Sequence, residues 1–353
     1  MYRTFLSAAL IAAIALTGCG GSGKSDKSNE GGAGAGASTP SSLPANQQAQ
    51  VGLSVDIAQL LKDEATASML KSNPELPPFV ASLDKLSAFV ALPGNMFADP
   101  SEYNFYVNCS FANAEDCKAA FDEMFKEAPA TDVEKAGKTF KKIAEPGGPT
   151  LFVTQDGNSI VAYSEAYLDS GADSFATEAL RGILNGEPKG EPFKMGIDIQ
   201  GASEFLSGVG AMAPQAEAFT KAKTLMTAGG GTGDLLFMLA IDAPDEDTAK
   251  KMKSTLQLGL ATIMGLASSQ MPSEEVAPAT NEFVTHVMSN LKPAVEGNTV
   301  KIVVNKPEGY EEMKKKMAGE AEKIQEEMMK RSMGGPGGPA GFPAGPGPEF
   351  EKK

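Results

Sequence analysis

Hydrophobic and polar positions alternate over residues 105–111, which predicts a half-buried β-strand. The apolar positions are Phe105, Val107, Cys109 and Phe111. Because successive side chains of a strand point to opposite faces, one face of this strand is expected to be buried. A helix is expected directly afterwards, since Asn113 can cap its start and the acidic Asp116 follows three positions later.

The helical segments carry apolar residues with helical spacing. After Asn113, the residues expected to face inward are Cys117, Ala120, Phe121, Met124 and Phe125. Later in the chain, a second helix that follows Asp245, Glu246 and Asp247 carries the stripe Met252, Leu256, Leu260, Ile263 and Met264. Such stripes are typical of helices that pack on a sheet with one side.

Three landmarks of this pattern recur in the same order about 140 residues later, which predicts a tandem duplication. The sequence 54–57, Ser-Val-Asp-Ile, is echoed by Gly-Ile-Asp-Ile at 196–199. The strand and helix at 106–121 are echoed at 237–252, and the turn Gly157-Asn158 is echoed by Gly297-Asn298. Both turns lie between apolar alternations and predict tight hairpins. The repeat units are expected to cover 47–190 and 191–332.

The predicted fold class is α+β, in which each unit is an antiparallel sheet with helices packed on one face. The pattern leaves open whether the two units form two lobes or one continuous sheet. A charged helix is expected over 310–332, with one stripe formed by Met313, Met317, Ala321, Ile324 and Met328. This stripe fits packing on the chain's own sheet or docking on a partner.

The first 18 residues have the layout of a secretory signal peptide. Arg3 provides the positive end, and the apolar run from Phe5 to Leu16 is too short to span a bilayer. Cys19 follows Leu16-Thr17-Gly18 directly, and a Gly/Ser-rich segment comes after it. Residues 19–46 are expected to form a disordered tether, and the Gly/Pro-rich residues 333–353 a disordered tail.

The sequence Leu16-Thr17-Gly18-Cys19 resembles the lipobox of bacterial lipoproteins. This resemblance implies that the Cys19 thiol carries a lipid, that the signal is cut before it, and that the protein faces the periplasm or the exterior. Two or three acyl chains provide a stable membrane anchor, whereas one binds reversibly. Gly20 in place of aspartate resembles the outer-membrane pattern if the source has two membranes. The rest of the chain is only loosely similar to uncharacterised duplicated envelope proteins.

The chain of 353 residues has a net charge of −14. This charge argues against binding to nucleic acid or to anionic lipid surfaces, since both require clustered lysine and arginine. It is compatible with a body that stays off the membrane apart from its lipid.

Cys109 and Cys117 remain when Cys19 is lipidated, and they predict a disulfide in an oxidising compartment. Cys109 faces inward on its strand and Cys117 lies one turn into the next helix, so the side chains should converge. The alternative is a pair of buried free thiols. The second unit has Ala240 and Thr248 at the matching places, so a disulfide would stabilise the first unit alone.

No set of residues forms a recognisable catalytic, cofactor or metal site. The glycine-rich stretch 227–233 does not have the spacing of a phosphate-binding loop and is expected to be a flexible connection. Asp242, Asp245, Glu246 and Asp247 do not have the spacing of a calcium loop, and carboxylates are common at helix starts. His286 is the only histidine and is expected on a helix face, so no histidine-based metal site or triad is predicted.

The sequence therefore favours a non-enzymatic, lipid-anchored binding or scaffold protein of the cell envelope, whose partner is a protein, a peptide or a small ligand. The alternative is an envelope hydrolase that uses paired carboxylates. Asp56 and Asp198 recur at matched positions and could form such a pair if they lay close together. The simpler interpretation is that each aspartate caps the helix after its strand.

Overall fold

The computed structural model describes residues 43, 47–62, 67, 78–95, 98–126, 130–135, 137–144, 149–168, 175–212, 217–230 and 233–334. The predicted signal peptide, Cys19, nearly all of the tether and residues 335–353 of the tail lie outside these residues. In the described part of the chain, no helix has the length and apolarity needed to cross a bilayer.

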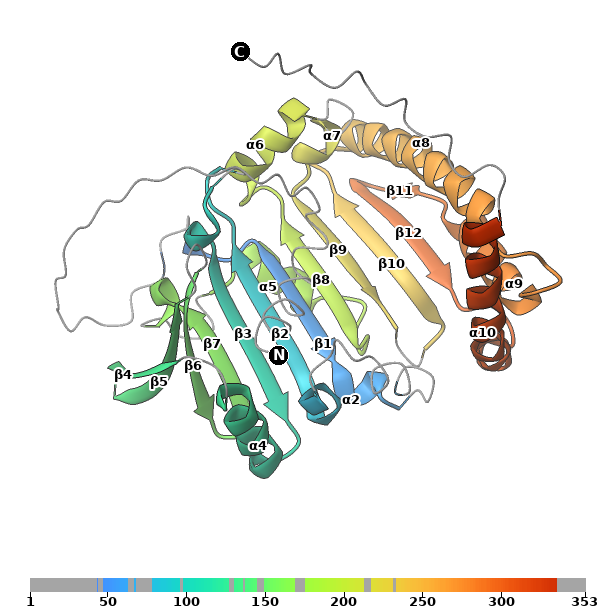
Figure 1. The fold of residues 1–353 in the computed structure, drawn as a ribbon. Helices are drawn as coiled ribbons and strands as arrows, with labels where there is room; N and C mark the ends of the chain where they lie inside the picture. The colour runs from blue at the N-terminus through green and yellow to red at the C-terminus, as the bar shows by residue number, and fades with distance from the viewer. Residues whose placement is uncertain are drawn as a thin grey trace, which may run out of the picture. The chain divides into compact units, whose positions relative to one another are not determined.

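Mixed strands and helices confirm the α+β class, with a large antiparallel sheet as the main feature (Figure 1). The strands of the N-terminal half are β1 (Val51–Asp56), β2 (Leu83–Ala91), β3 (Asn104–Phe111), β4 (Thr131–Lys135), β5 (Lys138–Ala144), β6 (Thr150–Asp156) and β7 (Ser159–Ser164). Its helical segments are α2 (Ile57–Leu60), η2 (Pro78–Ser82), η3 (Pro100–Glu102), α4 (Ala114–Phe125), η4 (Glu165–Tyr167) and α5 (Glu178–Asn185).

The C-terminal half contains fewer strands and longer helices. Its strands are β8 (Phe193–Asp198), β9 (Thr224–Gly229), β10 (Leu235–Asp242), β11 (Ala294–Glu296) and β12 (Thr299–Asn305). Its helices are α6 (Ser203–Met212), α7 (Glu217–Thr220), α8 (Glu246–Gln270), α9 (Pro278–Asn290) and α10 (Tyr310–Gly334).

Strands of both halves join in one sheet, so the sheet is continuous and is not split into two lobes. The strand order is β11-β12-β10-β9-β8-β1-β2-β3-β7-β6-β5-β4, and every neighbouring pair is antiparallel. The halves meet at β1 and β8, where Leu53 lies opposite Met195. Leu53 and Met195 have the same separation in the sequence as Asp56 and Asp198, which is the separation of the matched sequences 54–57 and 196–199.

One face of the sheet carries most of the apolar core. The strand residues Leu53, Val55, Val107 and Cys109 form a buried cluster with Cys117 and Ala120 of α4. Further along the same face, Ile241 and Val300 cluster with Ala249 and Met252 of α8. The predicted inward stripe of α4 therefore packs on the sheet, as an amphipathic helix does. On α8 the prediction holds for Met252 and Leu256, which join the core cluster, and it is wrong for Ile263, which is 61% exposed.

The helix α5 covers the other face, above the junction of β1 and β8. Gly52 and Gly196 lie directly opposite each other in this pair. A Cβ atom at Gly52 would lie 2.9 Å from Leu184 Cδ1, and one at Gly196 would lie 2.8 Å from Ile183 Cγ2. The two glycines therefore let a helix approach the backbone closely.

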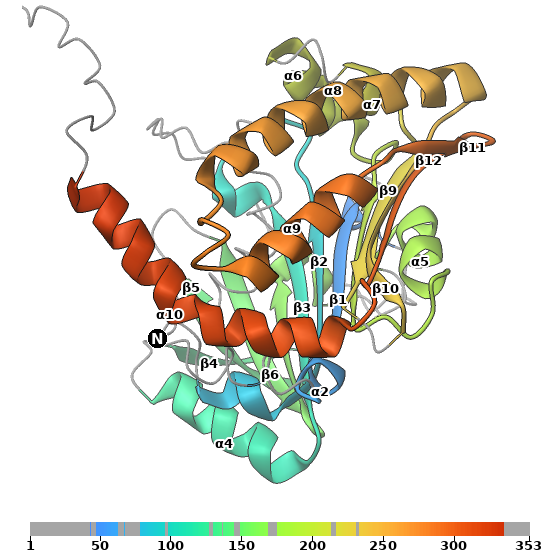
Figure 2. The same ribbon diagram turned by 90° about the vertical axis from the view of Figure 1, so that its right-hand side faces the viewer.

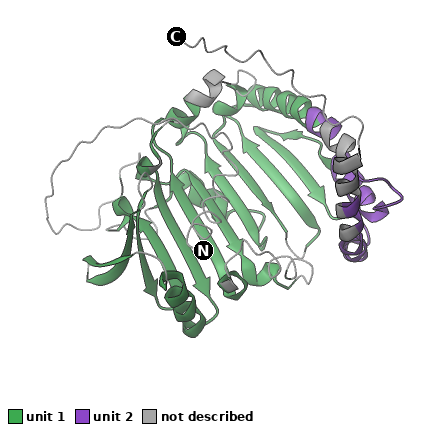
Figure 3. Ribbon diagram, viewed as in Figure 1, with its two compact units in different colours: residues 1–260, 290–306 green, residues 261–289, 307–353 purple. Residues whose placement is uncertain are grey.

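The chain divides into two compact units (Figure 3). Unit 1 contains residues 1–260 and 290–306, which include the whole sheet, and unit 2 contains 261–289 and 307–353. Within unit 2, both oxygens of the buried Glu320 carboxylate in α10 accept hydrogen bonds from the start of α9. The donors are the Ala279 N–H at 2.9 Å, the Thr280 N–H at 2.9 Å and the Thr280 hydroxyl at 2.8 Å.

Candidate functional site

The two predicted disulfide partners lie in the same core cluster. Cys109 on β3 and Cys117 on α4 are both buried, and the structure holds them side by side without a bond. Burial, and then the neighbouring Cys117, raise the pKa of the Cys109 thiol to about 12. The side chains converge as expected, and a bond between them stays a prediction. The strand register corrects the matching positions in the other half, which are Ile241 and Ala249 in place of Ala240 and Thr248.

Asp56 caps the helix α2 that follows its strand, as the simpler interpretation predicted. Asp198 instead closes the turn that precedes α6, which begins only at Ser203. Asp56 Oδ1 accepts from the Gln59 N–H at 2.7 Å, and Asp198 Oδ1 accepts from the Gly201 N–H at 2.8 Å. The Asp198 N–H donates a hydrogen bond to the Gln50 carbonyl. Gln50 directly precedes β1, whereas Asp56 is the last residue of β1, six positions later. The two carboxylates therefore lie at opposite ends of this pair, roughly 20 Å apart at ~3.3 Å per residue, and the structure does not bring them together.

The acidic residues near 242–247 have structural partners. Asp242 accepts hydrogen bonds from the hydroxyls of Thr224 at 2.8 Å and Thr299 at 2.7 Å, which lie on the two neighbouring strands. Asp245 accepts from the Thr248 N–H at 2.7 Å, and this hydrogen bond lowers the pKa of its carboxyl. Among the described residues, no group of three or more histidine, cysteine, aspartate or glutamate side chains could hold a metal ion.

The remaining predicted candidates lie on regular elements or between them. The stretch 227–233 begins as the end of β9 and leads toward β10, and residues 231 and 232 lie outside the described residues. His286 is half-buried on α9. On α10, Met313 is buried while Met317 and Ile324 are half-buried, and the side chains of Ala321 and Met328 lie outside the described part.

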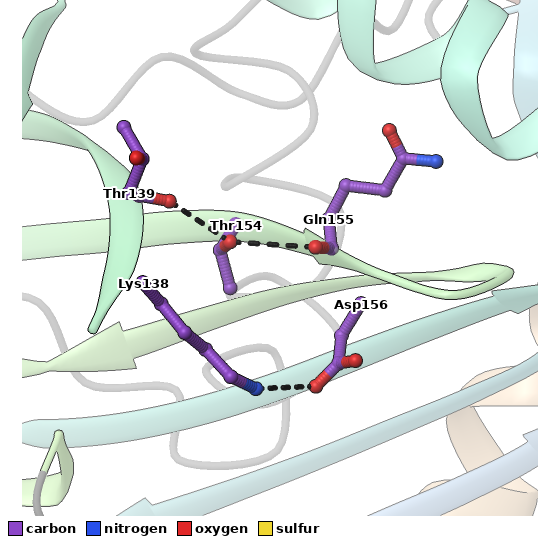
Figure 4. A network of polar contacts seen from close by, with 5 residues as sticks. All are labelled: Lys138, Thr139, Thr154, Gln155 and Asp156. Carbon is purple, nitrogen blue, oxygen red and sulfur yellow. Dashed lines mark hydrogen bonds and ion pairs between the residues drawn. The ribbon is translucent and has the colours of Figure 1, made fainter. Parts of the chain in front are cut away.

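The outer part of the sheet in the N-terminal half is covered by successive strands. The strand β7 pairs with β6 over six positions, then β5 and β4 follow. Side chains reinforce the pairing of β5 with β6 (Figure 4): Lys138 Nζ lies 2.7 Å from Asp156 Oδ2, and the Thr154 hydroxyl donates to the Thr139 carbonyl at 3.0 Å. Phe152 of β6 is 1% exposed, and Lys135 Nζ lies 4.8 Å from the centre of its ring.

At the other end of the sheet, in the C-terminal half, the described residues provide a shorter partner strand. The strand β11 pairs with β12 only at Thr299, Val300 and Lys301. Pro293 directly precedes β11, and because proline has no N–H to donate, it limits further pairing. Within the described part of the chain, Ile302–Val304 pair only with β10, on the inner side. Figure 2 views the sheet from this edge.

The same stretch of β12 contains an exposed apolar side chain. Val303 is 45% exposed, although its neighbours Ile302 and Val304 are buried. Sequence reasoning missed this edge because it located the hairpin at Gly297 but not the length of the strand before it. The closeness of Pro293 to that turn was the signal that could have revealed it.

Searches of family models and of curated proteins give no match to this chain. Among solved structures, the chain is similar to TP0453 in crystal form III, with 10% identity and a TM-score of 0.35, over 76% of this chain and 94% of that one. Crystal form I of TP0453 gives 10% identity and a TM-score of 0.34, over 76% of this chain and 92% of that one.

Proposed function

We propose that this chain is a non-enzymatic binding or scaffold protein of the bacterial cell envelope, anchored by a lipid on Cys19. The open, partly apolar edge at Val303 carries the binding role, since unpaired strand edges are natural sites for association. The lipobox-like sequence Leu16-Thr17-Gly18-Cys19 supports the anchor and the location.

We further propose that the body arose by tandem duplication. Hydrogen bonds recur at matched positions: Phe111 N donates to the Asn158 carbonyl at 2.9 Å, and Ala243 N donates to the Asn298 carbonyl at 2.9 Å. Asp56 and Asp198 recur in the same way, since each accepts a hydrogen bond from the N–H three residues later in the chain. The order of the strands is also repeated on the two sides of the β1–β8 pair. Counted outward from this pair, one side has β1-β2-β3-β7-β6 and the other has β8-β9-β10-β12-β11. This repetition supports a two-fold axis that passes between Leu53 and Met195.

The hydrolase alternative has less support. It required Asp56 and Asp198 to share one site, and each carboxylate is instead engaged by the backbone at its own end of the β1–β8 pair. Among the described residues, no other observation favours a hydrolytic reaction.

Metabolic labelling tests the anchor. Cells that express the full chain are fed an alkyne fatty acid, and the purified protein is examined for attached label. The wild-type chain should be labelled and should fractionate with membranes, whereas the Cys19→Ser variant should be neither labelled nor retained. Equal labelling of both chains, or of neither, would remove the basis for the envelope location.

A further inference from the structure

We propose that the open edge of β12 binds an extended apolar segment of a partner protein, which joins the sheet as an additional antiparallel strand. This inference rests on the binding role and on the duplication proposed above, and it names the kind of partner.

The N-terminal half contains a strand that already occupies the matching place. The turns at Gly157 and Gly297 have positive φ angles of 63° and 60°, so the hairpins can be aligned at these glycines. Counted from the turns, Tyr163 of β7 then corresponds to Val303 of β12. Tyr163 lies opposite Phe152, and the flanking positions lie opposite Leu151 and Val153.

These three residues of β6 are buried, with 3% exposure at Leu151, 1% at Phe152 and 4% at Val153. In the C-terminal half, β11 begins only at Ala294, opposite Lys301, so it does not extend to the positions opposite Ile302–Val304. Val303 points to the face of the sheet opposite to Ile302 and Val304, and in the described part of the chain no strand lies beside it on the outer side of β12. A segment in this place would satisfy main-chain groups along the edge of β12 and would cover Val303.

The edge also specifies the chemistry of its occupant. The segment must be extended and without proline inside it, because its N–H groups have to donate to β12. Its side chain opposite Val303 falls on the face of the sheet where Phe152 lies in the other half, so a large apolar residue fits. Two copies of this chain, each with a net charge of −14, repel each other. We therefore favour a neutral or basic partner segment over a second copy.

The chain itself supplies a probe. A fluorescent, end-blocked peptide with the sequence of residues 150–155, Thr-Leu-Phe-Val-Thr-Gln, is titrated with the full-length chain in mild detergent, and binding is measured by fluorescence anisotropy. The control peptide has proline in place of phenylalanine. We expect saturable binding of the first peptide and at least tenfold weaker binding of the second. Equal binding of both peptides, or of neither, overturns the proposal.

Two protein variants locate the binding. Val303→Asp should weaken binding at least tenfold, whereas Val133→Asp on β4, at the opposite end of the sheet, should leave it unchanged. Loss with Val133→Asp, or no loss with Val303→Asp, overturns the proposal. Hydrogen exchange of the wild-type chain provides a readout that needs no variant: saturating peptide should slow exchange in 302–304, and unchanged exchange contradicts strand addition.

Sedimentation of the wild-type chain without peptide tests the competing occupant. We expect a monomer, and a dimer abolished by Val303→Asp would replace the partner segment with a second copy. A chain that is lipid-labelled at Cys19 but does not bind the peptide would lose this inference and keep the proposed anchor, so the two failures are distinguishable.

Discussion

Gly196 has a steric role that one added methyl group can test. A Cβ at this position would lie 2.8 Å from Ile183 Cγ2 and 3.0 Å from Leu180 Cδ1 of α5. We expect Gly196→Ala to lower the free energy of unfolding by about 1–3 kcal/mol through overpacking. The matched control is Gly182→Ala in α5 itself, where a Cβ meets nothing within 4 Å. That change should stabilise the protein by about 0.5–1 kcal/mol. Urea unfolding measures both, and equal effects would contradict the steric role.

Glu320 is a buried carboxylate whose charge is stabilised by its hydrogen bonds. Burial acts to raise the pKa of Glu320, but the bonds from Ala279 and Thr280 outweigh it, so the pKa lies below the ordinary 4.5. A lowered folded-state pKa stabilises the protein above the unfolded-state pKa, and this stabilisation is lost as the pH falls through the folded-state value. We expect Glu320→Gln to cost about 2 kcal/mol at pH 7.

The same difference between wild type and Glu320→Gln should shrink as the pH falls below about 4.5, because the wild-type carboxyl is then protonated. Urea unfolding at pH 7 and at lower pH measures the difference. Glu312→Gln, an exposed position on the same helix, is the control and should change stability little at either pH. A difference that is constant with pH would show that Glu320 does not act through its charge.

The cysteine pair can be tested by thiol titration. Both side chains are buried and the pKa of Cys109 is raised, so neither thiol should react with a disulfide reagent in the folded protein at pH 8. After denaturation without reductant, the predicted disulfide leaves no thiol from this pair to titrate. Two reactive thiols at that stage would show that Cys109 and Cys117 are unpaired core residues.

At the scale of elements, the N-caps of α4 and α8 should contribute equally to the free energy of unfolding. Asn113 Oδ1 accepts from the Asp116 N–H at 2.8 Å, and Asp245 Oδ1 accepts from the Thr248 N–H at 2.7 Å. We expect Asn113→Ala and Asp245→Ala each to cost about 1 kcal/mol in urea unfolding. Asp247→Ala, in the first turn of α8 but not at its cap, should cost clearly less, and a larger loss there would contradict the assigned caps.

Local patterns predicted the elements that depend on local chemistry. The strand at 105–111, the cap at Asn113 and the hairpins at Gly157 and Gly297 are confirmed, because alternation, capping oxygens and glycine at positive φ act within a few residues. The pairing of β1 with β8 was not predicted, because it joins distant residues and no local pattern encodes it. The absence of a described partner strand outside Ile302–Val304 is likewise a property of the assembled sheet, which no local pattern encodes.

At the scale of the whole molecule, the two halves depend on each other at the centre of the sheet. The strands β1 and β8 pair over five positions, and α5 of the N-terminal half covers Gly196 of the C-terminal half. Either half alone would expose a central strand edge, which is prone to association. The connection between the halves passes through Gly190, an exposed residue with a φ angle of 80° and nothing near its Cβ position.

A cut in this connection should therefore leave the halves together. We expect a chain with a protease site inserted after Gly190 to elute as one complex from a sizing column after complete cleavage, and to separate only in denaturant. Leu53→Lys places a charge at the centre of the β1–β8 junction, opposite Met195, so the cleaved variant should separate or aggregate without denaturant. If the cleaved wild-type chain separates in native buffer, the hydrogen-bonded junction is too weak to hold the halves. The continuous sheet would then depend on the covalent connection.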